Sequence, residues 1–310
     1  MAHSPSIVEA RNLTKAYGSF VAVKRIDFTV RRQECFGFLG PNGAGKTSTM
    51  KMIYCRTPVT DGSLTVLGMD VRREERRIKH QIGVVTQDND LDPDLTVRQN
   101  LSVYASFFGL SRQQAREKAD ELLIFVQLQD KAKQFVRELS GGMKRRLTIA
   151  RALVNDPAIL ILDEPTTALD PQARLLVWQR LSELKARGVT LILSTHYMEE
   201  AARLCDRLVI MHEGRILTEG SPQRLIADHA AEYVLELPRH GQYNDILLNR
   251  LGNRIRFSET IGDTLFIYSE DGLSVRHSLL ELGVPSGSAT AREATLEDVF
   301  LRLTGRDLEE

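Results

Sequence analysis

A glycine-rich turn between an apolar run and a predicted helix constrains this chain more than any other feature. The run at 35–39 has the length and composition of a buried strand, and the turn after it fits the pattern G-x-x-x-x-G-K-[ST]. Glycines let several backbone N–H groups point at one centre, and the helix start adds the positive end of its dipole. The turn therefore predicts a nucleoside triphosphate site. Its residues are Gly40, Pro41, Asn42, Gly43, Ala44, Gly45, Lys46, Thr47 and Ser48.

Two side chains in this turn suit a triphosphate and its metal ion. Lys46 is expected to reach the β- and γ-phosphates as a point charge, and Thr47 offers its hydroxyl to Mg²⁺. The glycine spacing does not fit G-x-G-x-x-G, which disfavours a dinucleotide-binding fold. The turn alone leaves open whether the chain is a nucleotide hydrolase or a kinase.

Three further predicted strands end in residues that suit phosphate chemistry. One apolar run leads into Asp163 and Glu164. Two others lead into Gln87 and His196. Parallel strands deliver their carboxyl ends to the ligand edge of an open sheet. There Asp163 is expected to hold Mg²⁺, mostly through water, and Glu164 to accept a proton from the water that attacks the γ-phosphorus. Gln87 would orient water and touch Mg²⁺, and His196 would hydrogen-bond the γ-phosphate or that water. Glu164, Gln87 and His196, together with Lys46, make up the expected catalytic set.

Composition excludes several classes of partner. The 310 residues include 41 basic and 41 acidic side chains, a balance that argues against nucleic acid and against a polybasic membrane anchor. Three widely spaced cysteines give neither a metal pattern nor a disulfide framework, as expected in a reducing compartment. We see neither a signal peptide nor a run of roughly 18 apolar residues that would span a bilayer. At a membrane, other subunits would have to supply the span.

Strands that alternate with helices predict an α/β domain with a mostly parallel sheet covered on both faces. An antiparallel β subdomain is expected at the start, with strands at 7–13, 20–23 and 26–30. Apolar residues at helical spacing predict a helical insert at about 95–154. After residue 228 short strands and amphipathic helices follow. We therefore expect two domains, 1–228 and a small α+β accessory domain at 229–310.

A second candidate anion site opens a helix inside the insert. Ser140, Gly141 and Gly142 would present free N–H groups and a helix dipole. Two phosphate-binding helix starts are redundant in a single chain. They make sense if the second closes on a nucleotide that another subunit holds.

Taken in order, these motifs resemble those of ATP-binding-cassette (ABC) ATPases. The resemblance covers about residues 7–224 and implies a P-loop NTPase fold, with ATP and Mg²⁺ as cofactors. The sequence departs from the family pattern at two places: Met143 stands where glutamine is common, and Thr167-Ala168 stand where serine-glycine is frequent. Neither departure touches the proposed chemistry. The stretches that carry the resemblance are 40–48, Gln87, 139–143, 160–165, 168–170 and His196.

The resemblance also implies roles for individual residues. Tyr17 would stack on adenine. Ser140 and Gly142 would contact the γ-phosphate bound by a second copy of the chain, and Asp170 would lie in the loop that crosses the dimer interface. The helical insert, with Gln87 at its hinge, would dock on a membrane subunit.

The subfamily is similar to single-cassette ATPases of the ABC-2 exporter type, the drug-resistance and nodulation-factor export group. The stretches 35–40, 94–101 and 294–300 carry this likeness. It implies an ATPase that dimerises on ATP and powers export through separate transmembrane permease subunits. Such a subunit is expected at the cytoplasmic face of the inner membrane, as a peripheral protein.

Two alternatives remain at this stage. Soluble ABC ATPases of translation or DNA repair resemble paired cassettes or cassettes split by coiled coils, whereas this chain has one phosphate loop and no sustained heptads. The second alternative concerns the C-terminal domain, which would be chiefly regulatory or dimer-forming.

Overall fold

The computed structural model describes residues 6–239, 244–283 and 289–304. The chain forms two compact units, Met1–Glu219 and Gly220–Glu310. This division falls a few residues before the boundary expected after residue 228. The reason is that helix α8 (Pro222–His229) packs against α11 (Leu296–Thr304) within the second unit.

The first unit contains an antiparallel sheet with strand order β2-β1-β4-β5. Two strands were expected between residues 20 and 30, but the structure has the single strand β2. Arg25 adopts a positive φ of 53° inside it and absorbs the irregular pairing with β1, so the chain bends without leaving the sheet. The strands are β1 (Ser6–Tyr17), β2 (Phe20–Arg31), β4 (Asp61–Val66) and β5 (Met69–Asp70).

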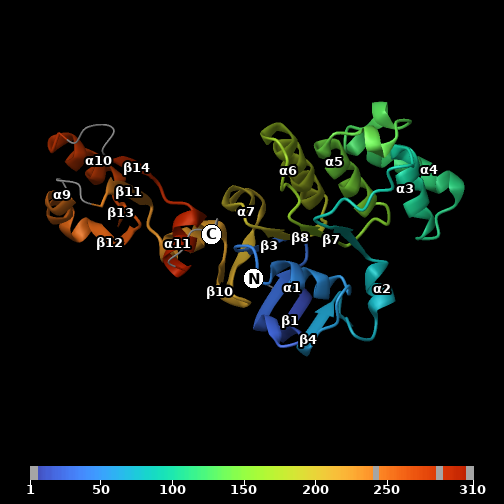
Figure 1. Ribbon diagram of the computed structural model, residues 1–310, viewed down its shortest axis with the longest axis horizontal. Coiled ribbons are helices and arrows are strands. Elements are labelled where there is room, and N and C mark those ends of the chain that lie inside the picture. Colours follow the sequence, from blue (N-terminus) through green and yellow to red (C-terminus); the bar gives the residue numbers. More distant parts are fainter. Residues whose placement is uncertain (1–5, 240–243, 284–288, 305–310) are drawn as a thin grey trace. The chain divides into compact units, whose positions relative to one another are not determined.

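A six-stranded sheet with the order β10-β9-β3-β8-β7-β6 forms the centre of this unit (Figure 1). β3 pairs in parallel with β8 and β9, and β7 pairs in parallel with β6 and β8. Every residue of β3, β7 and β8 is buried, which explains why apolar residues fill the middle of each strand. The strands are β3 (Cys35–Leu39), β6 (Ile82–Val85), β7 (Ile159–Asp163), β8 (Thr190–Thr195), β9 (Arg207–His212) and β10 (Arg215–Gly220).

Aromatic packing joins the two sheets of the first unit. The Phe28 ring of β2 lies edge-on to Phe38 of β3, with centroids 5.0 Å apart. Phe36 and Phe38 are also in edge contact, at 5.4 Å. Helix α1 (Lys46–Ile53) adds Met50, Met52 and Ile53 to the same core cluster. The phosphate loop is therefore anchored between two packed sheets.

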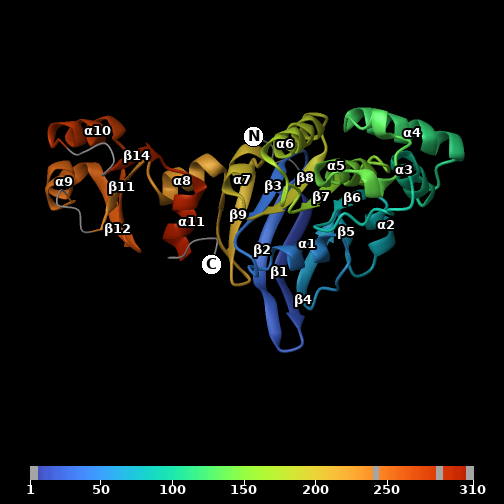
Figure 2. The same ribbon diagram turned by 45° about the horizontal axis from the view of Figure 1, so that its top comes forward.

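The helical insert is confirmed as α3 (Val97–Ser106), α4 (Arg112–Phe125) and α5 (Gly141–Ala152). Figures 1 and 2 show α3 and α4 beside one another at the β6 end of the sheet. Thr96 and Ser111 each begin a helix with a reciprocal capping box. Helix α5 packs tightly on β6, where a Cβ on Gly83 would lie 2.0 Å from the carbonyl oxygen of Ala152.

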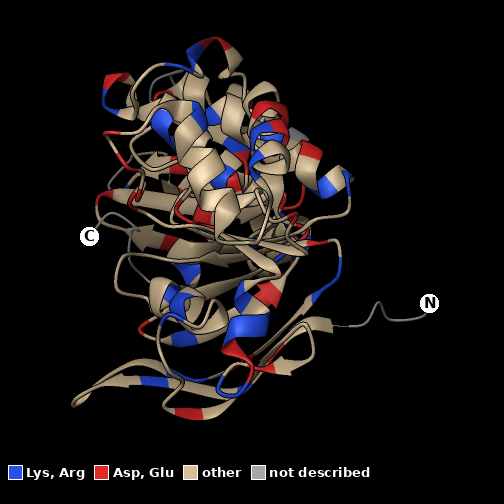
Figure 3. Cartoon of the chain, turned by 90° about the vertical axis from the view of Figure 1, so that its right-hand side faces the viewer, with Lys and Arg blue, Asp and Glu red and all other residues tan. Residues whose placement is uncertain are grey.

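Charged residues of both signs are interspersed over the helices on the side of the insert (Figure 3). The short helix α2 (Glu75–Lys79) illustrates the pattern, because Lys79 pairs with Glu75 and Arg77 with Glu74. In the described ranges, no helix is both long and apolar enough to cross a membrane.

The second unit follows the order β11-α9-β12-β13-α10-β14 along the chain, and its sheet has the order β12-β13-β11-β14. All three strand pairs are antiparallel. This is the ferredoxin-like βαββαβ arrangement. The elements are β11 (Tyr233–Pro238), α9 (Asn244–Leu251), β12 (Ile255–Ile261), β13 (Thr264–Ser269), α10 (Gly272–Glu281) and β14 (Thr290–Glu293).

This second unit has a hydrophobic core of its own. Leu235 and Ile267 of the sheet pack with Leu247 of α9 and Val275 of α10. At the start of α11, buried Asp298 accepts two hydrogen bonds from the Arg292 guanidinium and one from the backbone N–H of Thr295. The carboxylate of Asp298 therefore satisfies the backbone N–H of Thr295, the residue before α11.

Candidate nucleotide site

The strand order brings the predicted site residues to one edge of the central sheet. β3, β8, β7 and β6 are consecutive neighbours and run parallel. Their carboxyl ends lead into Gly40, His196, Glu164 and Gln87 respectively. Four segments that are distant in sequence therefore meet beside the phosphate loop.

Lys46 begins α1 and its side chain is almost fully buried. Its Nζ donates hydrogen bonds to the carbonyl oxygens of Gly40 (2.7 Å) and Pro41 (3.0 Å), so the loop wraps around the ammonium. Burial lowers the pKa of Lys46, and the negative charges of Glu164 and Asp163 oppose that shift. A polyphosphate brought to this loop would meet a cation that is already desolvated and positioned.

The backbone of the loop has the conformation that its glycines allow. Gly43 and Gly45 have φ of 81° and 100°, in the left-handed region that side chains disfavour. A Cβ on Gly45 would also lie 2.6 Å from the carbonyl oxygen of Ala22. Gly45 is the N-cap of α1, so the first N–H groups of that helix face the loop.

Thr47 and Asp163 lie side by side. The Thr47 hydroxyl donates to Asp163 Oδ1 at 3.2 Å, and the Ser194 hydroxyl donates to the same oxygen. Burial raises the pKa of Asp163, and the two hydroxyl hydrogen bonds oppose that shift. One hydroxyl and one carboxylate oxygen are the kind of small, hard donor set that Mg²⁺ accepts while it keeps waters and phosphate oxygens. The residues fit a magnesium ion.

Glu164 occupies a strained position immediately after β7. Its φ is 48°, in the left-handed region, and its side chain is buried. Its Oε1 lies 3.8 Å from Lys46 Nζ and 3.3 Å from His196 Nδ1, and its Oε2 accepts a hydrogen bond from the Thr167 hydroxyl at 3.2 Å. The carboxylate is therefore aimed at the phosphate loop and lies next to the predicted histidine.

Gln87 is the least engaged of the predicted catalytic residues. It follows β6 by two residues and is exposed, and its carbonyl oxygen accepts a hydrogen bond from Arg145 at 3.4 Å. Of the residues that the structure describes, none forms a hydrogen bond with the Gln87 amide group. Its predicted contact with Mg²⁺ stays a prediction.

The second predicted anion site lies at the start of α5, and among the described residues it forms no hydrogen bond with the phosphate loop. Ser140 is the N-cap of α5 and accepts a hydrogen bond from the backbone N–H of Met143. Ser140 and Gly141 are exposed, and a Cβ on Gly142 would lie 3.0 Å from the Cβ of Ala173 on α6 (Pro171–Ala186). Asp170 caps that neighbouring helix through the backbone N–H of Ala173.

Tyr17 ends β1 with nearly half of its surface exposed. The Nζ of Lys15 lies 4.7 Å from the centre of its ring and donates a hydrogen bond to Pro58. An exposed aromatic face next to a cation is suited to stacking on a base, and the adenine contact of Tyr17 stays a prediction.

Sequence reasoning missed one residue at this edge, Arg145 of α5. Its guanidinium is buried and donates to carbonyl oxygens that follow both β6 and β7. An arginine in a basic helical stretch is typical of a solvated surface, so nothing in the sequence distinguished it from Lys144 or Arg146.

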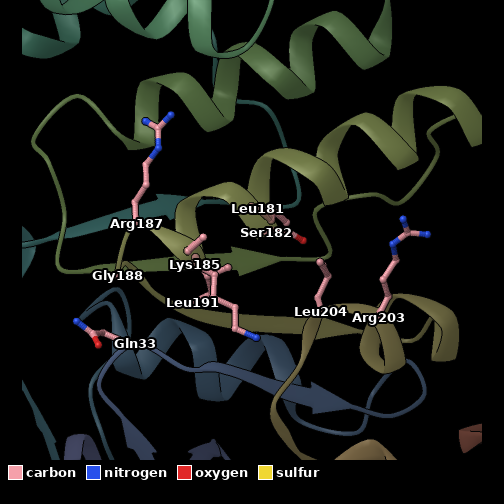
Figure 4. Close-up of a pocket in the computed structure, with 10 residues that line it drawn as sticks. Gln33, Leu181, Ser182, Lys185, Arg187, Gly188, Leu191, Arg203 and Leu204 are labelled. Atoms are coloured by element: carbon pink, nitrogen blue, oxygen red, sulfur yellow. The ribbon is translucent and has the colours of Figure 1, made fainter.

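A separate hollow of about 580 Å³ lies at the opposite end of the sheet (Figure 4). It is bordered by Gln33 and Gly188, which precede β3 and β8, and it contains none of the predicted site residues. Its cations already have partners, since Lys185 pairs with Asp206 at 2.6 Å and the Arg203 guanidinium lies over the Trp178 ring. This hollow is not the nucleotide site.

Comparison with models of known families matches both parts of the chain. Residues 23–167 match the ABC transporter family. Residues 245–305 match the C-terminal domain of the nodulation factor export protein NodI.

Relatives match over nearly the full length. Nod factor export ATP-binding protein I of Burkholderia lata is 47% identical over 303 residues, which make up 98% of each chain. The protein of the same name from Mesorhizobium japonicum is 47% identical over 303 residues, or 98% of this chain and 88% of that one.

Solved structures match the fold. One is the ATP-binding cassette MJ0796, a dimer in a post-hydrolysis state bound to ADP and Pi, with a TM-score of 0.65 and 29% identity over 69% of this chain and 98% of that one. Another is CbiO1 of Clostridium perfringens, part of the ABC transporter complex cbiONQ, with a TM-score of 0.67 and 29% identity over 72% of this chain and 91% of that one. The predicted P-loop fold is confirmed.

Proposed function

This chain belongs to the family of ABC transporter ATPases, and we propose that it works as a head-to-tail dimer in which two MgATP molecules are each held between two copies. In that dimer the phosphate loop of one copy and the Ser140 helix start of the other would bind the same triphosphate. The chain is an ATP-hydrolysing enzyme of its family.

One observation carries this proposal. Ser140 and Gly141 form an exposed helix start whose N–H groups are suited to phosphate. Among the described residues, this helix start forms no hydrogen bond with the phosphate loop of its own chain. In the proposed dimer, the phosphate loop of the second copy would bring a triphosphate to this helix start. The cassette MJ0796, which shares the fold, is described as dimeric with ADP and Pi bound.

The chemistry follows from the positions of the side chains. Lys46 would neutralise the β- and γ-phosphates, and Thr47 and Asp163 would hold Mg²⁺, which supplies charge neutralisation and orientation of the phosphates. Glu164 would accept the proton of the attacking water. His196, 3.3 Å from Glu164, would hydrogen-bond that water or the γ-phosphate.

We further propose that hydrolysis drives export through separate membrane subunits, with this chain as a peripheral subunit on the cytoplasmic face of the inner membrane. The relatives that match this chain over 98% of its length are named for Nod factor export. Their names support a transport role over the alternative of a soluble translation or repair factor. In the described ranges no helix could span the bilayer, so the path for the substrate would belong to another polypeptide.

A groove of about 450 Å³ in the first unit is the proposed docking surface for that membrane subunit. Tyr104, Phe107 and Phe108 line it, together with Arg76 and His80 of the α2 region. The wall next to Thr86 leads directly into Gln87. An amphipathic cytoplasmic segment with apolar and acidic residues would complement aromatic rings that are bordered by cations.

The test is the variant Glu164→Gln, which keeps the shape of the carboxylate without its basicity. We expect hydrolysis to fall by about 10²–10⁴, since a positioned base commonly contributes that much, while ATP binding persists. With ATP, size-exclusion chromatography should then show a dimer with two bound nucleotides, which Ser140→Ala in addition should weaken. Hydrolysis at the parent rate, or a monomer at every ATP concentration, would contradict the proposal.

A further inference from the structure

Arg145 of α5 bonds to the backbone of two separate loops at the nucleotide edge. After β7, its Nη2 donates to the carbonyl oxygens of Asp163 (3.0 Å) and Glu164 (2.8 Å), and its Nε donates to that of Pro165 (2.6 Å). After β6, its Nη1 donates to the carbonyl oxygens of Thr86 and Gln87. A single planar group therefore fixes both loops at once.

Burying the charged Arg145 side chain costs free energy. The Arg145 side chain is only 4% exposed, and burial lowers its pKa to about 10. Its hydrogen bonds go to neutral carbonyl groups, in the fork geometry that guanidinium has and ammonium lacks. A buried cation with backbone partners suggests that the positions of those carbonyls matter.

One of those carbonyls belongs to the strained residue Glu164. The φ of 48° costs free energy for a residue with a Cβ, and it persists only when neighbours hold it. On one side the N–H of Glu164 donates to the carbonyl and the hydroxyl of Ser194. On the other side its carbonyl accepts from Arg145. Ser194 and Arg145 together define where the catalytic carboxylate points.

Helix α5 connects this residue to the second anion site. Ser140 caps the helix, and Arg145 lies in its second turn. Thr148 and Arg151, further along the same helix, donate to the carbonyl oxygens of Asn89 and Asp90. A shift of α5 when Ser140 binds phosphate would therefore move the loop that carries Gln87 and the backbone of Glu164.

We propose that Arg145 is a positioning residue that couples the two ATP sites of the dimer: γ-phosphate bound at Ser140 sets, through α5 and Arg145, the position of Glu164 in the other site. This inference rests on the head-to-tail dimer proposed above. Each site then reaches its hydrolytic geometry only when the other is occupied, and hydrolysis becomes cooperative in ATP.

The experiment compares Arg145→Lys with Arg146→Lys in the full chain. Arg146 is the neighbouring half-buried arginine, and its Nη1 also donates to backbone carbonyls, of Val126 (2.8 Å) and Gln127 (3.2 Å), but these lie in the insert. ATPase rates are measured against ATP concentration, together with melting temperature. In Arg145→Lys we expect kcat to fall about 10–100-fold, because small displacements of reacting groups cost about that much. KM should change less than about threefold, and the Hill coefficient should fall toward 1. Arg146→Lys should keep the parent kcat and Hill coefficient.

The outcomes separate this inference from the dimer on which it rests. A parent enzyme that is cooperative and dimerises, with Arg145→Lys unchanged in kcat and Hill coefficient, overturns the inference and leaves the dimer standing. If the parent shows no cooperativity and the Glu164→Gln variant forms no dimer, both the inference and the dimer are overturned. If the Arg145→Lys protein unfolds below the assay temperature, Arg145→Gln, which keeps two N–H donors, is the second variant. It must lose cooperativity in the same way. Equal effects in Arg145→Lys and Arg146→Lys would reduce Arg145 to a packing role.

Discussion

The Nζ of Lys46 and the Oε1 of Glu164 lie 3.8 Å apart, with the two side chains only 4% and 8% exposed. The ammonium expected to bind phosphate therefore faces the carboxylate expected to accept a proton. Each group moderates the cost of burying the other, because opposite charges attract strongly where water is excluded. The pair holds both side chains at the place where the γ-phosphate would arrive.

Replacing Lys46 with methionine should weaken nucleotide binding without unfolding the protein. The lost charge-assisted hydrogen bonds are worth about 1.5–3 kcal/mol, so ATP affinity should fall about 10–100-fold. The assay is a titration with a fluorescent ATP analogue. Lys51→Met, on the last turn of the same helix, is the control and should bind like the parent. Equal affinities for the two variants would remove Lys46 from the site.

Alanine should be tolerated at Gly43 better than at Gly45. Both glycines have positive φ, which costs a residue with a Cβ about 1–2 kcal/mol. A Cβ on Gly43 would have no heavy atom within 4 Å, whereas one on Gly45 would clash with the backbone of Ala22. In urea unfolding, the free energy of unfolding of Gly43→Ala should therefore fall by that amount only. The free energy of unfolding of Gly45→Ala should fall clearly further. Equal losses would show that the Ala22 backbone yields freely.

A charge in the aromatic groove should release the membrane subunit and spare the chemistry. Phe107 is 72% exposed, and Phe107→Glu would place a carboxylate where an acidic segment is expected to dock. Co-purification with the membrane subunit should fall, while the ATPase activity of the isolated chain stays at the parent level. Ile124→Glu provides the matched control, because Ile124 is 65% exposed on α4 and does not line the groove. If both variants release the subunit equally, the groove is not the docking surface.

The buried Glu200 should make stability depend on pH. Burial raises the pKa of Glu200, against hydrogen bonds from Thr195, Thr166 and Trp178 that lower it. The folded state then binds more protons than the unfolded state between the ordinary pKa of 4.5 and the raised value. The free energy of unfolding must therefore fall as pH rises through that interval.

Glu200→Gln removes the titrating group and retains an oxygen that can accept from Thr166 and Trp178. Relative to the parent, this variant should gain stability as pH rises above 4.5. Urea unfolding at several pH values measures the difference. A difference between the two proteins that is constant with pH would mean that Glu200 does not titrate in this range.

The sequence was sufficient to predict which segments meet at the candidate site, because they contain chemically distinctive residue types. Glycines with positive φ, a lysine at a helix start and acids at a strand end each have few alternative explanations. Pairing at sheet edges was harder to predict. The edge strand β14 (Thr290–Glu293) has no apolar alternation and is extended because it pairs with β11. Arg145 was missed for a similar reason, since its importance lies in carbonyls contributed by distant loops.

The close contact between Gly83 and Ala152 limits how the helical insert can move. With no room for even a methyl group, the C-terminal end of α5 is seated at one point on the sheet, and the helix cannot slide along it. Arg145, in the second turn of α5, ties the other half of the helix to the loops after β6 and β7. A push from a membrane subunit on the insert would then travel along α5 as along a rigid rod, and it would reach Ser140 and the loops that Arg145 holds together.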